Sequence, residues 1–200
     1  MKNRQIAGVI LLTITVSACQ NNQTPKDPKP EAAYLEKTPE TEQITAGSDY
    51  LIENKTSHSF SDPAKKDAFF IGIKGKNLLD GKVVFTITSA EGKQLLKEEF
   101  DADYLLGYDF TGDIKSQKDT DAFIKKRMQS FFSEDKFSTP AIENDVVFED
   151  QSYYIDKETW EGIKSDKQAI GFYYLLGSED GRHIAFSKKK GKVVMYYNCC

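Results

Sequence analysis

The chain lacks the sequence signatures of the common enzyme classes. It contains no G-x-S-x-G, no H-E-x-x-H, no Walker loop, no dinucleotide-binding glycine pattern and no C-x-x-C pair. Its two histidines are His58, between two serines, and His183, after a charged turn. Adjacent residues of an extended chain point to opposite sides, so we interpret Ser57-His58-Ser59 as an ordinary polar loop. We expect His183 to be exposed, and we assign no catalytic residue, no metal ligand and no cofactor.

Arginine and long apolar runs are also scarce. Three arginines stand against 24 lysines, which leaves few candidates for bidentate recognition of phosphate or carboxylate. Acidic residues outnumber basic ones, and this balance argues against a nucleic-acid partner. The longest apolar stretch, residues 6–16, is about half the length that a membrane-spanning helix needs.

Residues 1–18 have the layout of a secretory signal. Lys2 and Arg4 precede the apolar stretch, and small residues then lead to a cysteine. The ending Val16-Ser17-Ala18-Cys19 resembles a bacterial lipobox. The resemblance implies cleavage between Ala18 and Cys19 and a lipid on Cys19, with two or more acyl chains that hold the protein firmly to a membrane. A secretory signal that ends at another site is the alternative. Gln20 in place of Asp favours the outer membrane, with the domain facing the periplasm.

Residues 19–45 form the lipidated N-terminus and a tether. Four of the six prolines occur here among Gln, Asn, Lys and Glu. This composition cannot bury a core and predicts a disordered spacer between lipid and domain. The remaining residues, 46–200, suit a single β-rich globular domain.

Alternating apolar residues predict two antiparallel meanders. The first comprises strands over 69–73, 83–88 and 94–100, with an earlier strand near 50–53, and the second comprises 170–176, 184–186 and 193–197. Between the two meanders we expect an amphipathic helix from Asp119 or Thr120 to Phe132, short strands at 146–149 and 152–155, and a brief helix capped by Asp156. The expected fold is mainly β (α+β), with the meanders forming a sandwich or a curved sheet.

Three tyrosine doublets are the best candidates for ligand contacts. Strand alternation sends one ring of each doublet away from the core, so Tyr153, Tyr173 and Tyr196 are candidate stacking residues for a sugar or a peptide. The alternative is a two-layer fold that buries one ring of each pair and half-covers the other.

Two further clusters carry a chemical hypothesis. Glu99, Asp101 and Asp103 alternate and would share a strand face, either as a calcium site or, as we favour, as a solvated edge. Cys199 and Cys200 are candidate redox residues. The alternatives for this pair are thiols without a role, a strained vicinal disulfide, an intermolecular bridge or ligands for a soft metal.

The segment F-F-I-G-I-K-G-K-N-L-L-D-G at 69–81, with the F-T-I-T strand that follows and the lipobox, resembles uncharacterised Bacteroides-type lipoproteins. The resemblance implies an envelope lipoprotein and supplies no catalytic residues. We expect a non-enzymatic binding or accessory module of the cell envelope, with a protein or a glycan as its partner. An envelope hydrolase built from scattered Asp, Glu, Tyr and His, or a redox or metal-responsive protein that uses the terminal cysteines, is the alternative.

Overall fold

The computed structural model describes residues 49–148 and 154–199, which belong to the compact unit Pro39–Cys200. The following expectations concern residues outside this part: the signal at 1–18, the tether at 19–45, and the roles of Ala18, Cys19, Tyr153 and Cys200. In the described residues, no helix is both long enough and apolar enough to cross a membrane.

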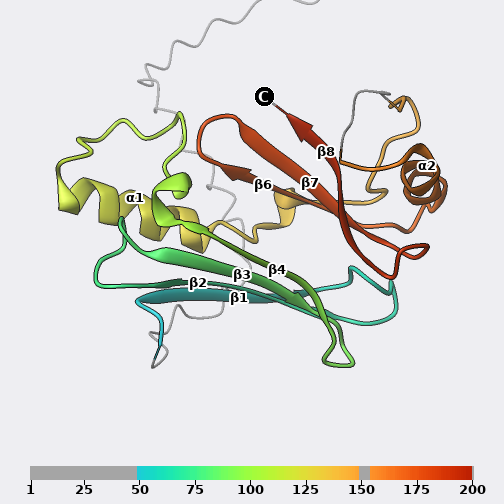
Figure 1. Cartoon of the computed structure of the whole chain (residues 1–200), viewed down its shortest axis with the longest axis horizontal. Helices are drawn as coiled ribbons and strands as arrows, with labels where there is room; N and C mark the ends of the chain where they lie inside the picture. The colour runs from blue at the N-terminus through green and yellow to red at the C-terminus, as the bar shows by residue number, and fades with distance from the viewer. Residues whose placement is uncertain (1–48, 149–153, 200) are drawn as a thin grey trace, which may run out of the picture. The chain divides into compact units, whose positions relative to one another are not determined.

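The first half of the described chain forms a four-stranded antiparallel sheet in the order β1-β2-β3-β4 (Figure 1). Its strands follow one another as the predicted meander: β1 (Ile52–His58), β2 (Asp67–Lys74), β3 (Lys82–Thr88) and β4 (Gln94–Asp101). Alternation places Phe69, Ile71 and Ile73 of β2 on the core face, opposite Ile87, Phe85 and Val83 of β3.

The second half forms another antiparallel sheet, in the order β5-β6-β7-β8. It contains the second predicted meander together with a two-residue edge strand: β5 (Phe137–Ser138), β6 (Gly171–Leu176), β7 (Asp180–Ser187) and β8 (Lys192–Cys199). Gly177 and Gly191 have φ values of 61° and 63° in the two hairpin turns, a region that glycine enters without steric cost.

Two α-helices complete the described fold. α1 (Gln117–Gln129) begins after Ser116, whose side chain accepts a hydrogen bond from the backbone N–H of Asp119. α2 (Lys157–Ser165) begins after Asp156, which caps Thr159 in the same way and confirms the predicted brief helix. The fold prediction is therefore confirmed: the described residues form two four-stranded antiparallel sheets with two helices, mainly β.

Three local expectations differ from the structure. α1 begins and ends earlier than predicted, because Ser116 and not Asp119 provides its cap. Residues 146–148, 154 and 155 form no strand, and the rest of the two short strands predicted at 146–149 and 152–155 lies outside the described residues. β6 pairs on its outer edge with the short β5, a strand that the sequence pattern did not predict.

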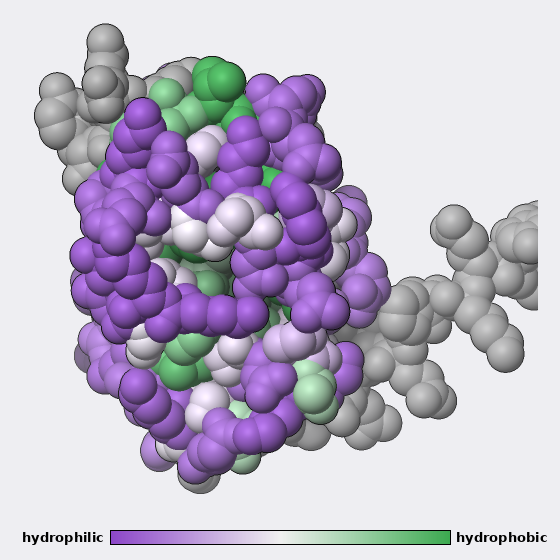
Figure 2. All heavy atoms as spheres, turned by 90° about the vertical axis from the view of Figure 1, so that its right-hand side faces the viewer, coloured by the Kyte–Doolittle hydropathy of each residue, from purple (hydrophilic) through white to green (hydrophobic). Residues whose placement is uncertain are grey.

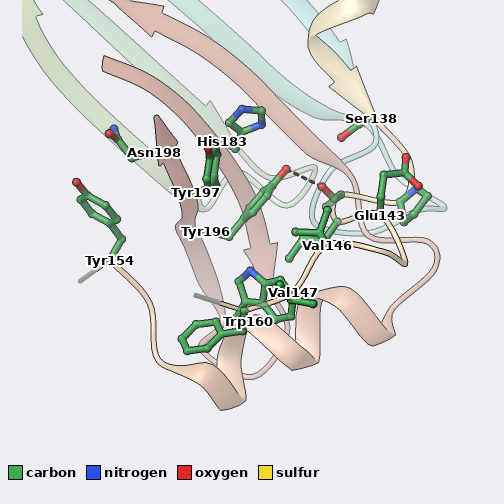
Figure 3. Close-up of a pocket in the computed structure, with 14 residues that line it drawn as sticks. Ser138, Glu143, Val146, Val147, Tyr154, Trp160, His183, Tyr196, Tyr197 and Asn198 are labelled. Atoms are coloured by element: carbon green, nitrogen blue, oxygen red, sulfur yellow. Dashed lines mark hydrogen bonds between the residues drawn. The ribbon is translucent and has the colours of Figure 1, made fainter. Parts of the chain in front are cut away.

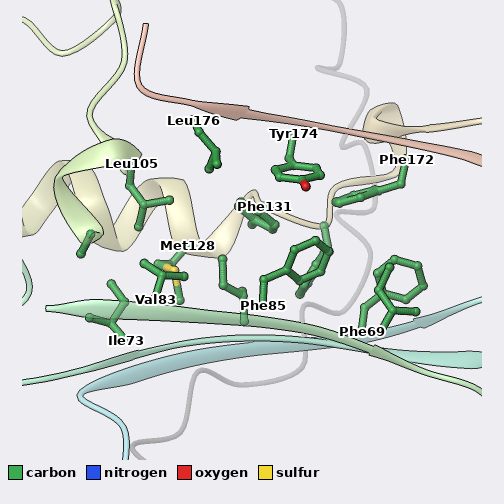
Figure 4. Packing of buried hydrophobic residues seen from close by; sticks show 14 of the residues in the cluster. Phe69, Ile73, Val83, Phe85, Leu105, Met128, Phe131, Phe172, Tyr174 and Leu176 are labelled. Carbon is green, nitrogen blue, oxygen red and sulfur yellow. The ribbon is translucent and has the colours of Figure 1, made fainter. Parts of the chain in front are cut away.

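The main core lies between the two sheets and α1. α1 and the second sheet lie on the same side of the first sheet (Figures 1 and 4). The ring of Phe85 lies 5.3 Å from that of Tyr174, 5.9 Å from that of Phe172 and 5.5 Å from that of Phe131, just beyond α1. Full burial of each such side chain contributes about 1.5–3 kcal/mol. This core fixes the second sheet, whose other face carries the candidate site.

Candidate ligand-binding site

The second sheet is covered on both faces. Phe172, Tyr174 and Ile184 face the main core. On the opposite face, Ala185 and Tyr196 belong to a separate apolar cluster that α2 and the segment around residues 141–148 complete. We call this opposite face of β6, β7 and β8 the outer face.

A row of aromatic rings crosses the outer face. Tyr173 of β6 pairs in register with His183 of β7, which pairs with Tyr197 of β8. The His183 ring lies 4.8 Å from that of Tyr173 and 5.3 Å from that of Tyr197. Cross-strand pairs of this kind stabilise a sheet, and they also place three flat side chains side by side.

A β-bulge places two neighbouring tyrosine rings of β8 on the outer face. His183 pairs with Tyr197 and Ile184 pairs with Met195, so Tyr196 is the extra residue and has no cross-strand partner on β7. An extra residue shifts the alternation of the strand by one position. Both rings of the doublet therefore lie on the outer face, where the His183 ring is 5.9 Å from that of Tyr196. Strict alternation would have sent them to opposite faces.

Three consecutive lysines in the turn between β7 and β8 bind α2. Lys188 pairs with Asp166 at 2.6 Å, Lys190 pairs with Asp156 at 3.0 Å, and Lys189 pairs with Glu158. The Lys188 ammonium lowers the pKa of Asp166. These pairs position α2, and with it Trp160, beside the aromatic row.

A pocket of about 720 Å³ lies where these parts meet. Tyr154 lies on one side of it and Ser138 and Glu143 on the other, with Trp160 and Tyr196 between them (Figure 3). The remaining lining residues come from the segment after β5 and from strands β7 and β8: Pro140, Ala141, Ile142, Val146, Val147, Phe148, His183, Tyr197 and Asn198. Figure 2 shows the side of the molecule that carries α2 as mostly hydrophilic, with hydrophobic side chains at its upper edge and in the hollows between the hydrophilic ones below.

Tyr196 forms part of the pocket wall and is held rigidly. Its ring is buried, and its hydroxyl donates a hydrogen bond to the carbonyl oxygen of Ala141 at 2.6 Å. A Cβ atom at Gly171 would lie 2.7 Å from that hydroxyl and 2.6 Å from Oγ of Ser138. Because Gly171 has no side chain, the Tyr196 hydroxyl and Ser138 can both pack closely against β6. Burial raises the pKa of Tyr196 to about 12, so the hydroxyl stays protonated.

The pocket offers hydrogen-bonding groups and little charge. Burial lowers the pKa of His183, so its imidazole is neutral at pH 7, with one nitrogen that donates and one that accepts. Among the described lining residues, Glu143 is the only carboxylate, and none is lysine or arginine. A glycoside hydrolase of the usual kind needs two carboxyl groups across the scissile bond. The described lining lacks that pair.

The structure brings together only some of the predicted site residues. Tyr173 lies in the aromatic row, with the Lys136 ammonium 5.0 Å from the centre of its ring, and Tyr196 lines the pocket. Tyr197, the other member of the third doublet, lines it too and is 47% exposed. Cys199 ends β8, and a Cβ added to Gly181 would lie 2.9 Å from its sulfur.

The other predicted clusters lie elsewhere. Glu99 and Asp101 are exposed on β4, which is an edge strand, and pair with Lys97 and Lys82. Across the described ranges, no group of three His, Cys, Asp or Glu side chains could hold a metal ion. His58 ends β1 and stacks on Phe137, with 4.0 Å between ring centroids.

Four lining residues were not predicted as ligand contacts from the sequence: Tyr154, Trp160, His183 and Tyr197. His183, expected to be exposed, is half-buried between tyrosine rings. The turn implied between the predicted strands at 170–176 and 184–186 was a usable signal, because a hairpin centred near residue 178 pairs positions 173 and 183. Nothing comparable in the sequence indicated that Trp160 of α2 would join them.

Comparisons of the chain with protein-family models, curated proteins and solved structures give no match.

Proposed function

We propose that this chain is a lipid-anchored cell-envelope protein that binds an uncharged organic ligand without chemical conversion. The single observation that supports this function is the pocket beside α2. Its volume falls within the range typical of small-molecule sites, and a few polar groups interrupt a mostly apolar and aromatic lining. The lipobox at Cys19 supports the anchor, and the proline-bearing stretch at 19–45 supports a spacer between lipid and domain.

Trp160 makes the binding function directly testable. It is the only tryptophan in the chain, and it lines the pocket. Its fluorescence therefore reports on the pocket without any label. We would titrate a library of uncharged fragments (aromatic amides, alcohols and methyl glycosides) into the full chain and record the emission of Trp160. The expected result is a saturable change with at least one chemical class.

A pair of matched variants identifies where the fragment binds. Tyr197→Ala removes a ring from the pocket, and Tyr104→Ala removes a ring of similar exposure, 50%, outside the lining. Binding in the pocket is lost or weakened in the first variant and kept in the second. Equal effects of both variants, or no saturable change with any fragment, would overturn the proposal.

The anchor has its own test. Cys19→Ala removes the sulfur to which the lipid would be attached, so the protein should move from the membrane fraction to the soluble fraction. Radiolabelled palmitate should be incorporated into the parent chain and not into the variant. Firm retention of the variant in washed membranes would contradict lipid anchoring at Cys19.

A further inference from the structure

We propose that the ligand of the pocket is a neutral saccharide, an inference that rests on the binding function proposed above. A sugar ring has an apolar face made of C–H groups and an edge made of hydroxyl groups. Its complement is a flat aromatic surface with donors and acceptors at its margin, and this pocket combines both features.

The flat surfaces lie at the mouth and along the wall of the pocket. Tyr154 is 51% exposed and Tyr197 is 47% exposed, so each keeps part of its ring accessible to a ligand. Trp160 and Tyr196 lie between the two sides of the pocket and are buried (Figure 3). The hydrogen bond to Ala141 holds the ring of Tyr196 in place. A ligand that stacks here meets rings already in position, which limits the entropy lost on binding.

Planar polar groups lie among these rings. The neutral imidazole of His183 contributes one donor and one acceptor, and the Glu143 carboxylate accepts only. Such groups match the neighbouring hydroxyls of a sugar, each of which both donates and accepts.

The charge of the lining distinguishes neutral saccharides from other ligands. The described lining has one carboxylate and no lysine or arginine, and the Lys164 ammonium beside it is hydrogen-bonded to the carbonyl oxygen of Val146 and lies 5.3 Å from the ring centre of Trp160. No described lining side chain therefore supplies a counter-charge to a phosphate, a sulfate or an acidic sugar. An acyl chain would offer no hydrogen bond to the imidazole of His183 in the lining, at a cost in free energy. A neutral saccharide satisfies both conditions.

The test is a titration of the full lipidated chain in a polyoxyethylene detergent, whose head group contains no sugar. The probes are neutral di- and trisaccharides of glucose, galactose, mannose and N-acetylglucosamine, followed by an array of neutral glycans. Matched probes are glucuronic acid disaccharides and uncharged, end-blocked tripeptides. Trp160 emission gives the Kd for each.

We expect at least one neutral saccharide to bind saturably, with a Kd that changes little between low and high salt. Tyr197→Ala should weaken it by about 5- to 10-fold, which corresponds to the loss of one stacking contact. Tyr197→Phe, which keeps the ring, and Tyr104→Ala, which leaves the pocket intact, should each stay within about twofold of the parent chain.

The outcomes separate the two proposals. Binding of tripeptides, acidic sugars or non-sugar fragments in place of neutral saccharides would overturn the saccharide inference and leave the binding function standing. Saccharide binding that Tyr197→Ala does not weaken would place the sugar elsewhere and overturn the inference as well. Failure of every probe and every fragment would overturn both.

Discussion

The hydrogen bond of Tyr174 to the opposite sheet allows a quantitative test of how the two sheets are joined. Tyr174 is buried on β6, and its hydroxyl donates to Oε2 of Glu98 on β4 at 2.8 Å. Nη1 of Arg182 on β7 lies 3.2 Å from the same oxygen. Burial raises the pKa of Tyr174, and the negative charge of Glu98 raises it further, so the hydroxyl remains a donor.

Tyr174→Phe removes the donor and keeps the ring in the core. A hydrogen bond to a charged group contributes about 1.5–3 kcal/mol to stability. The Glu98 side chain is 26% exposed and keeps Arg182 as a partner, so we expect the lower end, a loss of about 1.5 kcal/mol. Urea denaturation followed by circular dichroism measures the free energy of unfolding by linear extrapolation.

Tyr108→Phe is the matched control. The Tyr108 hydroxyl donates to Glu179 at 2.6 Å, but Tyr108 is 69% exposed, so its loss should change the free energy of unfolding by less than about 0.5 kcal/mol. Equal losses in the two variants would refute the argument that burial strengthens the bond. A double-mutant cycle of Tyr174→Phe with Glu98→Ala should give a coupling of about 1 kcal/mol, and a coupling below about 0.3 kcal/mol would show that the two groups act independently.

Three further predictions concern the pocket. Gly171→Ala places a Cβ 2.6 Å from Ser138 Oγ and 2.7 Å from the Tyr196 hydroxyl, so it should lower the free energy of unfolding by about 1–3 kcal/mol in urea; an unchanged value would contradict the close approach. Burial raises the pKa of Tyr196 from 10.0 to about 12, so its contribution to stability is complete below pH 10 and is lost as the pH rises through 12. Melting temperatures measured across this range should fall less steeply in Tyr196→Phe, and parallel curves would contradict the assignment. Burial lowers the pKa of His183 below 6.5, so its contribution is present above pH 6.5 and is lost as the pH falls. His183→Gln should therefore flatten the decline in melting temperature between pH 7 and pH 5, and an equal decline in both proteins would count against a buried neutral imidazole.

The strands were predictable where alternation and turns act together. Phe69, Ile71 and Ile73 are buried as their spacing indicated, because one face of β2 packs against the core over its whole length. The same rule holds for the doublet Tyr173-Tyr174, since β6 has no irregularity there: Tyr174 faces the core and Tyr173 the outer face.

The segment at 146–148 shows the limit of reasoning from local pattern. Val-Val-Phe has the composition of a strand, yet these residues pair with no strand. Phe148 packs against Trp160 at 5.5 Å, and the carbonyl of Val146 accepts a hydrogen bond from Lys164 of α2. β propensity describes a fit to a half-buried surface, and here the surface is a helix.

The bulge at Tyr196 decided the composition of the candidate site and could not be inferred from the sequence. An extra residue in β8 costs one pair of ladder bonds and becomes stable only if the residue finds another environment. Tyr196 finds it through Ala141 and the space above Gly171, which come from segments distant in the chain. A local alternation rule considers one strand at a time, so it assigns Tyr196 and Tyr197 to opposite faces. The tertiary contacts of one ring therefore determine that both rings face the pocket.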